Sequence, residues 1–145
     1  MNRNFFLEVG RYRLGYQYSP IIVNGNTYMV RHILYLGLCT LRAHHFFRGD
    51  DDRAPHSHPW VFVTFPFADY LEEVFDETGF VESRWVKRFR FHLRNKSFRH
   101  IVKFGNKGRP FWTLVLAGPV SQEWGFYPRP DKFVSWKEWP SGTAN

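Results

Sequence analysis

Apolar and polar residues alternate along most of this chain, which is typical of β-strands rather than helices. Successive side chains of a strand point to opposite faces, so a half-buried strand shows a period of two. No segment of ten or more residues carries a helical apolar stripe. The alternation predicts strands over 20–23, 27–36, 34–47, 58–67, 69–75, 80–93, 98–104 and 111–117, short extended pieces over 5–18, an extended stretch over 121–127, and a last strand or short helix over 133–139.

Turn residues separate these strands. Asn24-Gly25 lies between two apolar runs, and this pair supplies the positive φ angles that a tight hairpin turn needs. Gly49 ends the 34–47 stretch, and Gly79 suits the last position of a turn. We expect the tail from Pro140 to be frayed. Many short strands with frequent turns predict an all-β sandwich or barrel.

Two histidines stand at the entry of the predicted strand 58–67. His56 and His58 are two residues apart, and each is next to a proline, which favours extended backbone in the residue that precedes it. In an extended stretch both imidazoles point to the same side. His100 lies in a second predicted strand, so the three side chains could converge. In the alternative interpretation, His56 and His58 form hydrogen bonds within a polar loop and His100 packs at the end of its strand.

The residue types in this pattern suit a metal ion. Three neutral imidazoles with open coordination positions favour a divalent first-row ion such as Fe(II), Zn, Mn, Ni or Cu. Such an ion orients a substrate, activates water or binds oxygen. His56, His58 and His100 are therefore candidate ligands of a divalent metal ion with a small-molecule ligand beside it, and the spacing alone leaves the polar-loop interpretation open.

The order of these features resembles the cupin superfamily. The first cupin motif has H-x-H at a strand entry, followed four or five residues later by an acidic ligand, and the second motif, P-x-G-x-x-H, supplies a third histidine. His56 and His58 match the first motif, and residues 95–100 have the spacing of the second. The resemblance implies an antiparallel double-stranded β-helix, the cupin jelly roll, over a single domain of residues 1–145. It also implies a homodimer.

More specifically, the chain is similar to small cupin-like proteins encoded in bacteriophage genomes. The similarity covers roughly residues 30–140. The matching segments are Asp50-Asp51-Asp52-Arg53 with His56-Ser57-His58-Pro59-Trp60, Phe111-Trp112-Thr113-Leu114 with Gly118-Pro119, and Glu123-Trp124-Gly125-Phe126.

The sequence departs from the cupin pattern at the acidic ligand. Phe62 and Val63 stand where that ligand is expected, and Asn95 and Ser97 replace the proline and glycine of the second motif. Three possibilities follow: a site of three histidines alone, a fourth ligand from elsewhere, or a cupin without its metal. The candidates for a fourth ligand are His44, His45, His92 and Glu123.

Further residues are candidates for the pocket wall. Arg42 and His44 share one face of their strand, which lines the barrel mouth or faces solvent. Glu123, if buried, needs a cationic partner such as Arg42 or Arg53. An aspartate of the 50–52 run forms a turn or an ion pair, or holds a histidine tautomer. The complete set predicted for the pocket is Arg42, His44, Trp60, Phe62, Trp112, Glu123 and Trp124.

Composition narrows the class of protein further. The single cysteine, Cys39, excludes an internal disulfide framework and suits a cytoplasmic location, which would be the host cytoplasm for a phage protein. The N-terminal residues lack the apolar core of a signal peptide, and no apolar run approaches the roughly 20 residues of a membrane span. We therefore expect no membrane association.

The net charge of +7 raises the question of an anionic partner, including nucleic acid. The basic residues are densest between Arg84 and Arg99, where they alternate with aromatic residues. This segment is either the solvated face of a long strand or a patch that binds an anion.

The function expected first is a metal-binding cupin. Whether the protein is an enzyme stays open; if it is, metal-dependent oxidation or isomerisation of a small molecule is expected first. The rival function is a phage accessory protein that binds a nucleotide, nucleic acid or a host protein. A third is a structural component of the phage particle.

Overall fold

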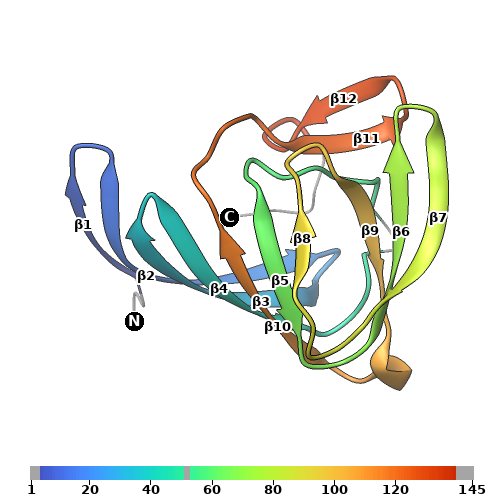
Figure 1. Ribbon diagram of the computed structural model, residues 1–145, viewed down its shortest axis with the longest axis horizontal. Helices are drawn as coiled ribbons and strands as arrows, with labels where there is room; N and C mark the ends of the chain where they lie inside the picture. Colours follow the sequence, from blue (N-terminus) through green and yellow to red (C-terminus); the bar gives the residue numbers. More distant parts are fainter. Residues whose placement is uncertain (1–3, 51–52, 140–145) are drawn as a thin grey trace.

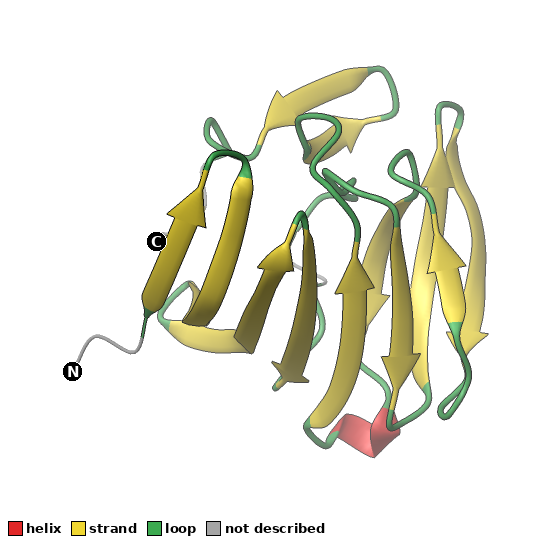
Figure 2. Ribbon diagram, turned by 60° about the vertical axis from the view of Figure 1, so that its left-hand side comes forward, coloured by secondary structure: helices red, strands yellow, loops and turns green. Residues whose placement is uncertain are grey.

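Nearly every element of the structure is an antiparallel β-strand (Figures 1 and 2). The computed structural model describes residues 4–50 and 53–139. One sheet has seven strands in the order β1-β2-β3-β4-β10-β5-β8, a second has three in the order β7-β6-β9, and β11 pairs with β12. The strands are β1 (Phe5–Val9), β2 (Tyr12–Val23), β3 (Asn26–Gly37), β4 (Cys39–Phe46), β5 (Phe62–Pro66), β6 (Tyr70–Asp76), β7 (Gly79–Val86), β8 (His92–Arg94), β9 (Arg99–Lys103), β10 (Phe111–Ala117), β11 (Gly125–Arg129) and β12 (Lys132–Ser135).

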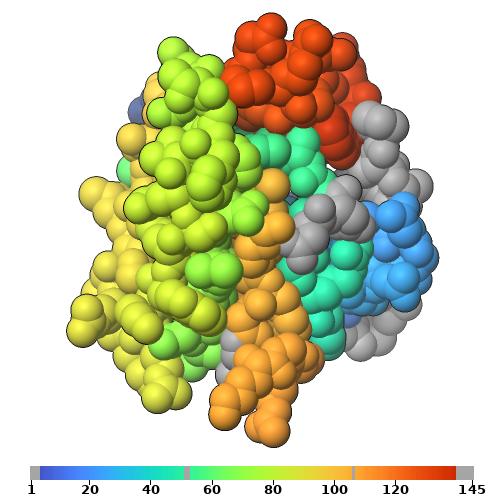
Figure 3. All heavy atoms as spheres, turned by 90° about the vertical axis from the view of Figure 1, so that its right-hand side faces the viewer, coloured from blue at the N-terminus to red at the C-terminus, as the bar shows by residue number. Residues whose placement is uncertain are grey.

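The two larger sheets are joined by an aromatic core. Phe46 of β4 and Phe111 of β10 stack with ring centroids 5.1 Å apart, and Phe111 stacks in turn on Tyr70 of β6 at 5.4 Å. Tyr28 and Val102 belong to the same buried cluster. Each such side chain contributes about 1.5–3 kcal/mol when it is fully buried. The β6–β7 hairpin and β9 cover one face of the molecule, with the β11–β12 hairpin above them (Figure 3).

The hairpin predicted around Asn24-Gly25 is confirmed. Val23 pairs with Asn26, and the two turn residues have φ angles of 52° and 76°. Residues 5–18 also form a hairpin, because β1 pairs with the first half of β2. The predicted strand over 111–117 coincides with β10.

The prediction of one continuous stretch over 34–47 is wrong. The chain reverses at Gly37, whose φ is 82°, and Leu36 pairs with Cys39 across the turn. Apolar and polar residues go on alternating through this turn, so the sequence pattern did not reveal the reversal. The second half of the predicted stretch is nevertheless a strand, β4. Its alternate residues Thr40, Arg42 and Phe46 share one face and are buried.

The prediction of one long strand over 80–93 is also wrong. β7 ends at Val86, residues 87–91 form a connection in which Phe89 has a φ of 57°, and β8 joins the seven-stranded sheet by pairing with β5. The basic segment from Arg84 to Arg99 therefore contributes to both sheets and does not form one strand face.

Smaller differences concern the residues at which other strands begin or end. The predicted strand over 58–67 begins only at Phe62, and the extended stretch over 121–127 becomes a strand only from Gly125. The last predicted element is a strand, β12, rather than a helix. The tail from residue 140 lies outside the described residues. Within 4–50 and 53–139 no helix has the length and apolar character of a membrane span.

Candidate metal centre

The structure brings His56, His58 and His100 together. One ring nitrogen from each lies within 4.8 Å of the other two, and Nε2 of His58 is 3.0 Å from Nε2 of His100. Two nitrogens that bind one metal ion at about 2.0–2.1 Å stand at a similar separation. Two lone pairs at 3.0 Å repel unless a proton or a cation lies between them, so this spacing fits a shared metal ion.

The backbone fixes this convergence. The N–H of His56 donates to the carbonyl of His100, and the N–H of His100 donates back to His56, both at 3.2 Å. The two residues are thus directly opposed in an isolated antiparallel bridge. Pro55 and Ser57 extend the bridge to β11 through hydrogen bonds with Tyr127 and Gly125. The prolines next to His56 and His58 keep this segment extended, as the sequence predicted.

A buried glutamate orients His100. Glu72 of β6 has no solvent-exposed surface, and its Oε2 lies 3.1 Å from Nδ1 of His100. Its Oε1 accepts hydrogen bonds from Arg84 Nε at 2.8 Å and from Arg94 Nη2 at 2.7 Å. Burial alone would raise the pKa of Glu72, but the hydrogen bond with His100 and the charges of His100 and Arg94 outweigh it and lower the pKa to about 2. An ionised carboxylate only accepts, so Nδ1 of His100 carries the proton and Nε2 is left as the ligand atom.

A second buried carboxylate lies behind His56. Oδ2 of Asp50 is 3.5 Å from Nδ1 of His56, and Asp50 is fully buried. Burial raises its pKa to about 7. Its backbone N–H donates to Val102 of β9, which ties it to the strand that carries His100. Carboxylates on the far side of metal-bound imidazoles set their tautomer and orientation. Asp50 is placed for the tautomer-holding role considered for the 50–52 run; residues 51 and 52 lie outside the described part.

Burial keeps two of the three histidines neutral. It lowers the pKa of His56 and His58 well below the usual value, and nearby positive charge lowers them further. Neutral imidazole is the form that binds a metal. His56 and His58 are therefore already in their ligating protonation state at neutral pH.

Within residues 4–50 and 53–139, no carboxylate joins the three histidines in place of the missing acidic ligand. Phe62, at that position, is buried and places its ring 4.5 Å from the ring of His58. Among the four candidates for a fourth ligand, only His44 lines the cavity, and its Nε2 is buried without a hydrogen-bond partner. The others lie elsewhere: His45 stacks on Trp112 at 4.3 Å, His92 contacts the Lys87 carbonyl, and exposed Glu123 accepts from Ser135.

A cavity of about 90 Å³ opens over the three histidines, and a neighbouring one of about 100 Å³ adjoins it. Five of the residues predicted for the pocket line one or both: Arg42, His44, Trp60, Phe62 and Trp124. Trp112 and Glu123 line neither cavity.

Sequence reasoning missed Glu72, Arg94, Arg31 and Arg53 as residues around the histidines. One signal could have found Glu72. It shares the inward face of its strand with buried Tyr70, and a charged residue on a buried face needs a partner or a function.

The chain matches no family model and no curated protein. Its fold does resemble solved structures. The crystal structure of the Fe(II) form of HppE aligns with a TM-score of 0.58 at 8% identity, over 70% of this chain and 56% of that one. Hydroxypropylphosphonic acid epoxidase from S. wedmorenis aligns with a TM-score of 0.52 at 10% identity, over 68% and 55%.

The fold is that of a cupin. The jelly-roll prediction with antiparallel sheets is thereby confirmed. The chain spans little more than half the length of these structural neighbours, and identity at this level shows the fold alone. Within this cupin fold, three histidines could hold a divalent metal ion.

Proposed function

We propose that this cupin binds a divalent first-row metal ion through Nε2 of His56, His58 and His100. The observation that carries the proposal is the convergence of three ligand atoms within 4.8 Å, with buried carboxylates behind two of the rings. Both features belong to metal sites and neither is needed in a polar loop. Nitrogen ligands suit Fe, Zn, Mn or Ni.

The ion would act as a Lewis acid or activate oxygen or water on a small molecule. The protein's own contribution is positioning and exclusion of water. Glu72 fixes His100, and the rings of Trp60 and Phe62 line the cavity as apolar walls. The absence of an acidic ligand disfavours chemistry of the 2-oxoglutarate type, which commonly uses a carboxylate on iron. We propose oxidation or isomerisation of a small molecule. The structural neighbours, one named as an Fe(II) form and one as an epoxidase, support this class.

Elemental mass spectrometry of untagged protein purified without chelator tests metal binding. We expect near-stoichiometric metal in the parent, its loss in His58→Ala, and its retention in the matched variant His45→Ala. His45 is a suitable control because its side chain stacks on Trp112, on the face of β4 opposite to that of His44 and the cavity. Parent protein without metal, even after incubation with iron, zinc, manganese and nickel, would refute the proposal.

The phage origin, the homodimer and the cytoplasmic location stay predictions. The edge strand β1 supports self-association, because all of its residues are exposed and most are apolar. A direct role in nucleic-acid binding is less well supported, since Arg84 and Arg94 are engaged by Glu72 and Arg99 by two backbone carbonyls.

A further inference from the structure

The cavity of about 100 Å³ beside the histidines is lined by positive charge. It shares His44, His56, His58 and Trp60 with the cavity over the candidate metal centre, so the two cavities adjoin at these side chains. Three arginines line it and, among the described residues, no acidic one does. The arginines come from different places in the fold: Arg31 from β3, Arg42 from β4 and Arg53 from the loop before His56.

The arginines have few hydrogen-bond partners. Arg42 is only 8% exposed, donates from Nε to Thr40 at 2.9 Å, and stacks on the ring of Trp60 at 3.9 Å. Arg31 donates from Nη2 to Ser19 at 2.8 Å. Arg53 lies over Phe126 at 4.7 Å. Within the described part of the chain, none of these guanidinium groups forms an ion pair with a carboxylate.

The cavity wall holds donors without acceptors. Nε of Arg31, Nε of Arg53 and Nε1 of Trp60 are all buried and have no hydrogen-bond partner. A buried donor left unpaired costs about 1–3 kcal/mol, and more when it is charged. Burial, followed by the nearby charge of Arg31, lowers the pKa of Arg42 to about 10, so the group is still a cation at neutral pH. Arg53 lies within electrostatic reach of the buried carboxylate of Asp50, but Arg31 and Arg42 meet no carboxylate among the described residues, and this indicates that an anion is missing.

We propose that this cavity binds the oxyanion group of a small ligand, a carboxylate or a phosphate, on Arg31, Arg42 and Arg53. Guanidinium groups bind both anions through paired hydrogen bonds. The inference rests on the proposed function and extends it: the anionic group docks at the arginines, and the remainder of the ligand lies beside His56 and His58. The substrate class is therefore a small acid, and the size of the cavity limits it to a compact molecule.

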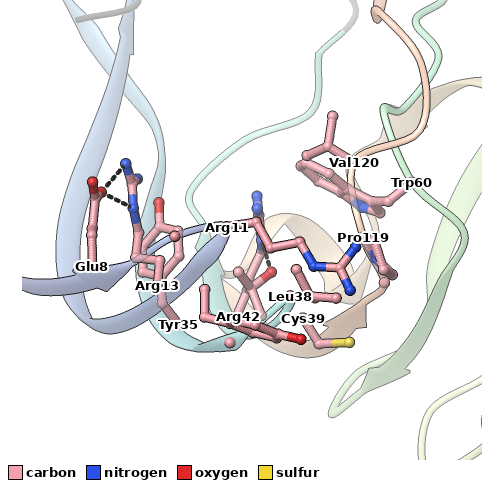
Figure 4. A pocket seen from close by; sticks show the side chains of 15 residues that line it. Glu8, Arg11, Arg13, Tyr35, Leu38, Cys39, Arg42, Trp60, Pro119 and Val120 are labelled. Carbon is pink, nitrogen blue, oxygen red and sulfur yellow. Dashed lines mark hydrogen bonds and ion pairs between the residues drawn. The ribbon is translucent and has the colours of Figure 1, made fainter.

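A hollow of matching charge adjoins this cavity, and we infer that it is the entrance. The hollow, of about 540 Å³, lies outside the cavity, between the β1–β2 turn and the loop around Pro119 (Figure 4). Arg42 and Trp60 line both the hollow and the cavity. Arg11 extends into the hollow, whereas Arg13 is paired with Glu8. A basic entrance raises the local concentration of anions and the rate of their association.

Thermal unfolding with added inorganic phosphate, and separately with acetate, tests the inference, because a ligand of the folded state raises Tm. We expect phosphate or acetate to stabilise the parent, and isothermal titration to show binding at least about tenfold weaker in Arg31→Met and Arg42→Met. The response to each anion distinguishes a phosphate from a carboxylate ligand. Arg90→Met, in the exposed connection before β8, is the matched control and should bind like the parent. Circular dichroism establishes that each variant is folded.

Metal binding and anion binding can fail separately. In His58→Ala, which lacks a metal ligand, the arginines remain and phosphate or acetate should still stabilise the protein. A parent protein that takes up no metal but still binds the anion would support the arginine cavity and refute only the metal centre. If neither anion stabilises the parent at millimolar concentrations, or if both arginine variants bind it as the parent does, the inference is wrong. If Arg42→Met does not fold, Arg31→Met decides the outcome.

Discussion

Two groups of arginines near the histidines differ in their partners. Arg84 of β7 and Arg94 of β8 share the carboxylate of Glu72. On the side of β3 and β4, Arg31 and Arg42 meet no carboxylate among the described residues. The first arrangement is complete within the protein and holds His100 in place. The second has hydroxyl acceptors but no carboxylate. We take this difference as the one between a structural ion pair and a site that binds an anion.

The largest effect is expected from Glu72→Gln. The substitution keeps the shape but leaves Arg94 without a counter-charge and Arg84 with only Glu82, and it gives His100 a weaker acceptor. Loss of one partner of a buried ion pair costs about 3–5 kcal/mol, so the free energy of unfolding should fall by about 3 kcal/mol. Urea denaturation measures it. Glu82→Gln is the control, because exposed Glu82 reaches Arg84 only at 3.5 Å and should change stability by less than about 1 kcal/mol. Equal losses in both variants would contradict the structural role of Glu72.

The comparison is tested most directly by the same substitution on each side. Arg94→Met removes a partner of Glu72 and should lower the free energy of unfolding by about 2–3 kcal/mol. Arg42→Met removes a cation that has no carboxylate partner and should leave stability within about 1 kcal/mol of the parent, or raise it, because an apolar side chain needs no counter-charge. Urea denaturation of both proteins without added anions measures the difference. A greater loss in Arg42→Met than in Arg94→Met would contradict the assignment.

Asp50→Asn sharpens the account of the metal site. The amide is a weaker acceptor for Nδ1 of His56 than a carboxylate, so the ring becomes a poorer ligand. Loss of such a partner typically lowers metal affinity about 10–100-fold. Competition with a chromophoric chelator measures the affinity, and Asp69→Asn, on the surface before β6, supplies the control. Unchanged affinity in Asp50→Asn would show that the carboxylate 3.5 Å from His56 does not support the metal.

The smallest effect is expected at Asp69, which forms an exposed ion pair with Lys87. A hydrogen bond from the backbone N–H of Arg88, followed by that from Lys87, lowers the pKa of Asp69. A lowered pKa in the folded state stabilises the protein above the unfolded value, and this contribution is lost as the pH falls through the folded pKa. Asp69→Asn should therefore be slightly less stable than the parent at pH 7 and equally stable at pH 2. A difference that persists at pH 2 would exclude the ionised carboxylate as its source.

Strand alternation and the histidine spacing carried most of what could be predicted from the sequence. They indicated the all-β fold, the extended segment at His56 and His58, and the shared face of Arg42 and His44, but not that this face points inward. The reversal at Gly37 was missed because apolar residues alternate on both sides of it. The connection over 87–91 was missed because its basic and aromatic residues alternate as they do in a strand.

The environment of the histidines could not be predicted in the same way. The partners of Glu72 are 12, 22 and 28 residues away along the chain, and only the pairing of β6 with β7 and β9 brings most of them near. Within residues 4–50 and 53–139, Arg31 and Arg42 have no carboxylate partner, and this depends on which residues the fold leaves away from them. Sequence alone shows the charges but not the absence of neighbouring carboxylates.

The most direct test of the account is a crystal structure of the metal-loaded protein grown with phosphate, with anomalous diffraction measured at the absorption edge of the metal. We predict one anomalous peak within about 2.0–2.2 Å of a nitrogen of each of His56, His58 and His100. We also predict tetrahedral density in contact with Arg31 and Arg42. No metal at these three histidines, or a metal bound at His45 on the outer face instead, would contradict the central claim.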